Sequence, residues 1–246
     1  MPESAWRVAV IDSGVGRCAP VRLHSARRFI DGGTHITGSE LAPDPTGHGT
    51  AVARIIASAG VPIELCMAQV TDTEGRATPA AVAEALCWAL AERAQLIHLS
   101  LGLRNDRAVL AGAIARAVVA GLVIVAATPA RGVRTYPAAY PGVIRATGDA
   151  RCTAEEISYL GTALADFGAC AVHRSAARPA QRGASIGAAH LTRFILAHVP
   201  PATHPVAVST LLARHAQYRG AERRNGWEIA APATAFDNRR SRAGGS

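Results

Sequence analysis

Short apolar runs bounded by turn residues recur along this chain. They are rich in Val, Ile, Leu and Ala and alternate little with polar residues. This pattern is typical of strands that are buried on both faces of a parallel sheet. The expected strands are residues 7–12, 63–70, 96–100, 122–127 and 143–147.

Between these runs, apolar residues recur at spacings of three and four, the period of a helix with one buried face. The helix expected over residues 79–94 begins at Pro79, because proline is tolerated in a first helical turn. The helix expected over residues 107–120 stops at Gly121. The remaining expected helices are residues 50–59, 185–198 and 206–219, with the last one ending at Gly220.

Strands that alternate with helices predict an α/β fold of three layers, with a mainly parallel central sheet and helices on both faces. We expect one domain over residues 1–235, followed by a polar, Gly-rich tail at residues 236–246. In such a sheet, ligands bind beyond the carboxyl ends of the strands. Functional side chains are therefore expected to gather at that edge.

Composition narrows the class of protein. Hydrophobic residues make up 49% of the 246 residues but aromatics only 4%, so small aliphatic side chains must fill the core. No apolar run approaches the ~20 residues that span a bilayer, and the start does not read as a secretory signal. The five cysteines are odd in number and form no CxxC pair. We therefore expect free thiols in a reducing cytoplasm, with no membrane partner, disulfide framework or cofactor.

The formal net charge is +8, and all 26 basic residues are arginine. This bias, with the high Ala content, indicates a GC-rich bacterial genome. The arginines are scattered and not interleaved with aromatics, which favours a solvated basic surface and no nucleic-acid partner. The alternative, a nucleic-acid-binding protein, would lose its binding above ~0.2 M salt.

Three segments carry candidate chemistry. Asp12 follows the first expected strand, His48 lies in Gly-His-Gly-Thr before a helix, and Ser185 opens a helix. A serine hydroxyl is a weak nucleophile until a histidine takes its proton, and the histidine needs a carboxylate to orient it. A serine at a helix N-terminus also places its backbone N–H where an oxyanion can develop.

Each fragment alone has a structural explanation. Asp-Ser-Gly is an ordinary turn, Gly-His-Gly-Thr can be a helix entry with a capping threonine, and a serine between small residues is often a helix cap. Their occurrence together, in the order Asp, His, Ser, favours nucleophilic catalysis, since this order is one of three known for the same geometry.

The same segments resemble those of a known family. Residues 8–15 (VAVIDSGV), 47–56 (GHGTAVARII) and 183–190 (GASIGAAH) resemble the aspartate, histidine and serine motifs of the subtilases. Residues 96–102 (LIHLSLG) and 136–148 (YPAAYPGVIRATG) are similar to the family's substrate-pairing strand and to a segment beyond its active site. The resemblance extends from about Arg7 to His198, in chain order.

This resemblance implies a serine endopeptidase. Ser185 would form the acyl intermediate, His48 would act as general base and then general acid, and Asp12 would orient His48. The substrate would be a peptide or protein that binds as an extended strand between two segments. By position these are Ser100, Leu101 and Gly102 on one side and Glu74, Gly75 and Arg76 on the other.

The first specificity pocket is expected between residues 126–131 and 100–102. Arg131 would lie near its rim, where it could select an acidic substrate residue or remain a solvated surface arginine. If the two segments do not bind substrate, residues 100–102 are the buried end of a strand and residues 74–76 are a surface turn.

The oxyanion region departs from the family pattern. Subtilases carry Ala-Ala-Gly-Asn, whereas this chain reads Ala-Ala-Thr-Pro-Ala, so that Ala130 takes the place of the asparagine. Losing one such donor lowers turnover by about 10²–10³, a magnitude measured on subtilisin itself. The N–H of Ser185 would remain, and Thr128 is the nearest substitute. The rival interpretation is a weak or inactive pseudoprotease that binds an extended peptide or a partner protein.

Other departures shape the remaining expectations. Ala189 replaces the proline of the serine motif, which the helix should tolerate. Residues 59–62 offer no carboxylate cluster, so we expect no Ca²⁺ between His48 and Val70 and no catalytic metal. His98 and His190 are expected to be packed rather than catalytic. The first strand begins close to the start, without room for a propeptide, which favours an intracellular enzyme that processes one precursor peptide.

Overall fold

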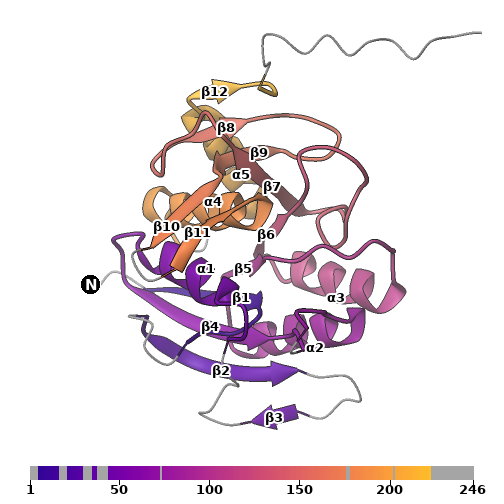
Figure 1. The fold of residues 1–246 in the computed structure, drawn as a ribbon. Helices are drawn as coiled ribbons and strands as arrows, with labels where there is room; N and C mark the ends of the chain where they lie inside the picture. The colour runs from indigo at the N-terminus through magenta and orange to yellow at the C-terminus, as the bar shows by residue number, and fades with distance from the viewer. Residues whose placement is uncertain are drawn as a thin grey trace, which may run out of the picture.

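The computed structural model describes residues 5–16, 21–29, 35–37, 44–72, 74–175, 178–201 and 203–222 (Figure 1). A central sheet of ten strands runs in the order β12-β8-β9-β7-β6-β5-β1-β4-β2-β3. Its strands are β1 (Trp6–Asp12), β2 (Leu23–Phe29), β3 (His35–Thr37), β4 (Ile63–Gln69), β5 (Leu96–Leu99), β6 (Val123–Ala127), β7 (Val143–Asp149), β8 (Ile157–Tyr159), β9 (Phe167–Cys170) and β12 (Tyr218–Arg219).

The inner part of this sheet, from β9 to β2, is parallel throughout. Only β3 and β8 run antiparallel to a neighbour. A separate two-stranded hairpin pairs β10 (Val172–Ser175) with β11 (Arg178–Arg182). The expected α/β fold with a mainly parallel central sheet is therefore confirmed.

Helices cover both faces of the sheet (Figure 1). One face carries α1 (His48–Ala57), α4 (Ala184–His198) and α5 (Pro205–His215), and the other carries α2 (Pro79–Ala91) and α3 (Ala108–Val119). In β1, Val8 and Val10 pack into the core beneath α1 and α4, while Ala9 and Ile11 pack into the core beneath α2 and α3. This division confirms strands buried on both faces.

The last expected helix is partly wrong. It ends at His215 rather than near Arg219, and Tyr218–Arg219 forms β12 at the sheet edge. The backbone N–H of Gln217 donates to Ile157 O at 3.0 Å, and its side-chain Oε1 accepts from Ile157 N at 2.9 Å. Pairing with β8 therefore overrides the helical sequence pattern at the end of this segment.

Residues 223–246, which include the expected tail at 236–246, lie outside the described residues. Within the part that is described, no helix is long and apolar enough to cross a membrane.

Candidate active site

Asp12 is the last residue of β1, at the carboxyl ends of the parallel strands, and it is 5% exposed. Its Oδ1 lies 2.9 Å and its Oδ2 3.1 Å from His48 Nδ1, and Oδ1 also accepts the backbone N–H of Ser13 at 2.6 Å. A carboxylate accepts hydrogen bonds, so this contact assigns the hydrogen of a neutral His48 ring to Nδ1. Nε2 is then left with a free lone pair and can act as a base.

His48 is the first residue of α1, and two glycines allow this helix to begin beside Asp12. Gly47 has φ 71°, a conformation that glycine adopts without strain. A Cβ on Gly49 would lie 2.2 Å from the carbonyl oxygen of Gly14. The start of α1 can therefore approach the turn after β1 only without a side chain at residue 49.

Asp44 is a buried carboxylate that the sequence interpretation missed. Its Oδ2 accepts from the backbone N–H and hydroxyl of Thr50, and its Oδ1 accepts from Gly47 N and Ser13 Oγ. Burial raises the pKa of this carboxyl, but the hydrogen bonds from Thr50, Ser13 and Gly47 outweigh it, so the pKa is lowered. Asp44 lies three residues before Gly47, the N-cap of α1, so the preference for acidic residues at the N-cap gave no signal for it.

Two carboxylates act on the His48 ring. Burial lowers the pKa of its imidazole, but the hydrogen bond and charge of Asp12, together with the charge of Asp44, raise it above its ordinary value. The neutral, basic form of His48 therefore prevails only at a pH above this raised pKa.

Ser185 is the second residue of α4, where its N–H has no helical partner four residues earlier. Gly183 precedes the helix with φ 126°, and a Cβ on Gly187 would lie 2.3 Å from Thr147 O. The first turn of α4 thus lies directly against the end of β7.

The hydroxyl of Ser185 donates to the carbonyl oxygen of Ser100 at 3.0 Å. Among the hydrogen bonds of the described residues, none joins Ser185 to His48. Ser185 and His48 are linked indirectly. Ser100, which accepts from Ser185, donates its backbone N–H to the carbonyl oxygen of Ile11 at 3.4 Å, and Ile11 precedes Asp12, the partner of His48. The side chain of Gln181 also donates to Gly47 O at 3.3 Å, next to His48. The fold therefore gathers the three candidate residues at one sheet edge.

His98 lies behind this edge and is fully buried. Its Nδ1 lies 2.9 Å from Thr192 Oγ1 on α4, and its Nε2 lies 2.7 Å from Ser100 Oγ. Burial lowers the pKa of His98 to about 4, with Asp12 acting in the opposite direction. A neutral, packed His98 matches the sequence interpretation. His190 is also buried, and desolvation lowers its pKa to about 4.

Thr128, the expected substitute donor, forms no hydrogen bond with Ser185 among the described residues. Thr128 is 2% exposed, its N–H donates to Ala146 O, and its side chain lines a pocket with Arg134 and Thr135. Ala130 is exposed. The oxyanion roles expected for Ser185 N–H, Thr128 and Ala130 stay predictions.

Two of the three residues of the first expected substrate segment, Leu101 and Gly102, have a free backbone. Ser100 is 8% exposed, and no hydrogen bond of the described residues uses the backbone of Leu101 or Gly102. Leu103 then pairs with Tyr136 through two backbone hydrogen bonds. An extended peptide can therefore add to residues 101–102.

The second expected segment is a closed turn. The Oδ1 of Asp72 accepts from the N–H groups of Glu74 and Arg76, and Gly75 N donates to Asp72 O. The Arg76 side chain is paired with Glu74 and Asp72. This turn contributes an exposed surface, and no described contact joins it to residues 100–102.

No group of three or more His, Cys, Asp or Glu residues suited to a metal occurs among the described residues. The expectation that no metal takes part stays a prediction.

A parallel sheet that carries a carboxylate, an imidazole and a helix-opening serine at one edge is an arrangement found in serine hydrolases. Comparison with known proteins narrows this class. The model of the subtilase family, Peptidase_S8, matches residues 3–244, and the chain belongs to this family.

Two curated relatives match part of the chain. The chain is 33% identical over 150 residues to a thermostable alkaline protease of Halalkalibacterium halodurans, covering 56% of this chain and 40% of the relative. It is 28% identical over 153 residues to subtilisin DY of Bacillus licheniformis, covering 56% and 54%. The chain therefore spans about half the length of these relatives.

Solved structures share the fold. The S41 psychrophilic protease matches with a TM-score of 0.64 at 20% identity, covering 86% of this chain and 82% of that one. Sphericase matches with a TM-score of 0.64 at 18% identity, covering 86% and 83%. These likenesses confirm the subtilisin-like architecture.

Proposed function

We propose that this chain is a serine endopeptidase in which Ser185 is the nucleophile, His48 the general base and Asp12 the residue that orients His48. One observation carries the proposal: the buried Asp12 carboxylate holds the Nδ1 edge of His48, at the sheet edge where α4 presents Ser185. Membership of the subtilase family supports it.

The reaction follows from these positions. His48 Nε2 takes the proton of Ser185 Oγ as that oxygen bonds to the substrate carbonyl carbon, and the carbonyl oxygen becomes an oxyanion near Ser185 N–H. The carbon–nitrogen bond then breaks, and the amine leaves with the proton from His48. A water molecule repeats the sequence on the acyl-enzyme and releases the carboxylic acid.

The Ser185 hydroxyl must first leave the Ser100 carbonyl oxygen. A substrate that adds to residues 101–102 would compete for the polar groups of this segment. Binding of the peptide would therefore favour the serine conformation that faces His48, since catalytic hydrogen bonds often form only in the complex.

A fluorophosphonate probe tests whether Ser185 is activated, without knowledge of the substrate. The full chain should be labelled on Ser185, and labelling should be absent in Ser185→Ala and strongly reduced in His48→Ala. Ser58→Ala, which removes a hydroxyl at the far end of α1, should be labelled like the parent chain. A native protein that is not labelled would contradict the proposal.

The pseudoprotease alternative is favoured by two specific observations. The Ser185 hydroxyl is hydrogen-bonded to the Ser100 carbonyl oxygen rather than to His48. Ala130 occupies the position at which the family has its oxyanion asparagine. Tight binding of an extended peptide by an unlabelled native protein would be the result that supports this alternative.

We infer further that the enzyme processes a narrow set of peptides, such as a precursor, rather than degrading proteins broadly. The weakened oxyanion site supports this, because slow chemistry is compatible with a dedicated substrate. Digestion of unfolded casein compared with a peptide library tests it. Rapid, unselective cleavage of casein would be evidence against it.

We propose a reducing compartment such as the cytoplasm as its location. Cys66, Cys87, Cys152 and Cys170 are unpaired, and burial raises the pKa of the Cys66 thiol and that of the Cys152 thiol, the latter to about 12. Cys18 lies outside the described residues. Cell fractionation tests the location, and recovery of the protein from the medium with disulfides would contradict it.

A further inference from the structure

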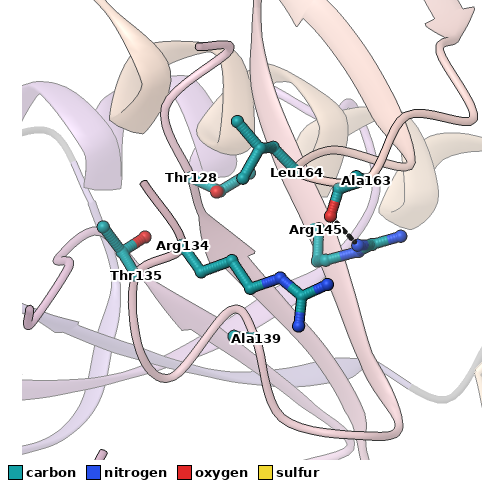
Figure 2. Close-up of a pocket in the computed structure, with 7 residues that line it drawn as sticks. All are labelled: Thr128, Arg134, Thr135, Ala139, Arg145, Ala163 and Leu164. Atoms are coloured by element: carbon teal, nitrogen blue, oxygen red, sulfur yellow. Dashed lines mark hydrogen bonds between the residues drawn. The ribbon is translucent and has the colours of Figure 1, made fainter. Parts of the chain in front are cut away.

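A pocket of about 110 Å³ lies next to the end of β6, where Thr128 follows the strand (Figure 2). It is lined by Thr128, Arg134, Thr135, Ala139, Arg145, Ala163 and Leu164. This volume is well above the ~10–15 Å³ that one ordered water needs, so the pocket can hold a side-chain-sized group.

The pocket carries an uncompensated positive charge. Arg145 is neutralised, because its guanidinium pairs with Asp166 and donates to Ala163 O. Arg134 forms no hydrogen bond or ion pair with any described residue. Figure 2 shows its guanidinium reaching across the pocket toward Arg145. Since Arg134 is exposed, a ligand can reach it from solvent.

Two hydroxyls complete a polar lining. Thr135 Oγ1 is buried without a hydrogen-bond partner, and it points into the pocket in Figure 2. Thr128 adds a second hydroxyl from the end of β6. A buried hydroxyl without a partner is unfavourable. Since Thr135 Oγ1 has almost no accessible surface here, the side chain must rotate before it can donate to a ligand.

The pocket adjoins the proposed path of the substrate. A Cβ on Gly102 would lie 3.1 Å from Thr135 Cβ, so the free backbone of residues 101–102 runs directly against the pocket wall. The same segment begins at Ser100, whose carbonyl oxygen accepts from Ser185 Oγ. Thr135 thus contacts Gly102 and also lines the pocket, whereas residues 100–102 do not line it, so a side chain of a peptide bound to residues 101–102 would enter the pocket past Thr135.

We propose that this pocket binds an acidic side chain, aspartate or glutamate, of the peptide substrate, with Arg134 as the residue that sets this specificity. The inference rests on the proposed function only in that the ligand is a peptide. Arginine binds a carboxylate through two parallel N–H donors, and the threonine hydroxyls can donate to the same group. Arg131, expected near the rim of the first specificity pocket either to select an acidic residue or to remain solvated, does not line this pocket, whereas Arg134 does.

The test measures binding apart from cleavage. The full-length Ser185→Ala protein is incubated with an array of octapeptide pairs, in which the members of a pair differ only by Glu against Gln at one position. Bound peptides are resynthesised and titrated by calorimetry. The Glu member should bind about 10–100-fold more tightly, as expected for a charge-assisted hydrogen bond.

Two variants in the Ser185→Ala background make the test specific. Arg134→Gln should remove the preference for Glu, and Arg131→Gln, a change of the same kind three residues earlier on the loop, should retain it. Equal binding of Glu and Gln peptides, binding of neither, or a preference that survives Arg134→Gln overturns the proposal. A Glu preference in a protein that the fluorophosphonate does not label supports the pocket and rejects catalysis.

Discussion

The carboxylate of Asp44 accepts hydrogen bonds from both the backbone N–H and the hydroxyl of Thr50, at 2.8 and 2.6 Å. Thr50 lies two residues beyond His48 in the first turn of α1. The other oxygen of Asp44 binds the hydroxyl of Ser13, next to Asp12. One buried carboxylate thus ties the His48 helix to the turn that carries Asp12.

Asp44→Asn should lower the pKa of His48. Removing the Asp44 charge takes away one of the influences that raise this pKa, so the neutral base should persist to a lower pH. We expect the acidic limb of kcat/KM to move to lower pH, and NMR titration of the His48 ring to move in the same direction. Glu155→Gln, which removes an exposed carboxylate paired with Arg193, should move neither.

Asp44→Asn should also destabilise the fold by about 1–3 kcal/mol, the usual loss when buried donors lose a charged acceptor. Because the pKa of Asp44 is lowered in the folded state, its stabilisation is present above the ordinary carboxyl pKa and is lost as pH falls through the folded value. Urea unfolding at neutral pH measures the difference. An unchanged His48 titration would show that Asp44 acts only on stability.

His98 should make the protein sensitive to acid. Its pKa is lowered to about 4, so between pH 6.5 and 4 the unfolded chain binds a proton that the folded protein excludes. Stability should therefore be complete above pH 6.5 and fall by up to about 3 kcal/mol as pH drops to 4.

Urea unfolding of His98→Gln across this pH range checks the effect. The variant cannot take up a proton at residue 98, so its stability should fall less steeply with acid, whatever its stability at neutral pH. His215→Gln, an exposed histidine on α5, should keep the steep fall. Parallel slopes for all three proteins would assign the acid sensitivity to other groups.

Gly49→Ala should disrupt the candidate active site. The added Cβ would lie 2.2 Å from Gly14 O, and backbone must move to relieve this contact. We expect a loss of at least about 1–3 kcal/mol of stability, as for overpacking, and loss of fluorophosphonate labelling. Thermal melting and labelling measure the two effects.

Gly112→Ala on α3 is the matched control. The nearest atom to its added Cβ is Arg116 Nη1 at 3.7 Å, an ordinary contact. Alanine is a better helix former than glycine by about 0.5–1 kcal/mol, so this variant should be at least as stable as the parent. A Gly49→Ala protein that melts and labels like Gly112→Ala would refute the close approach of α1 to Gly14.

Ala130→Asn should raise turnover if the exposed residue 130 can be directed at the oxyanion. A restored donor acts on charge that develops in the transition state, so kcat should rise by roughly 10–10³-fold with little change in KM. Kinetics on a peptide from the array measures this. Ala130→Gln, with a longer side chain, tests whether the position of the amide matters. Unchanged turnover would indicate that the Thr128-Pro129 turn directs residue 130 away.

Five of the inner strands and the identity of the candidate residues could be predicted from the sequence. The strands β1, β4, β5, β6 and β7 appear as mainly apolar runs, because burial on both faces leaves few polar positions. The strand β2, next to the edge strand β3, reads LHSARRF, with four of its residues polar or charged, and it has no such signal. It forms because β4 supplies backbone partners, which local pattern cannot reveal.

Which of these residues come into contact depends on the tertiary structure. Asp12 and His48 are brought together because α1 begins against the end of β1, and Asp44 joins them through a loop that a sequence pattern leaves open. Arg131 and Arg134 are equivalent by composition and lie on the same loop, yet only Arg134 lines the pocket. Side-chain direction at the end of a strand depends on backbone angles and on packing between distant segments, and local residue preferences contain neither.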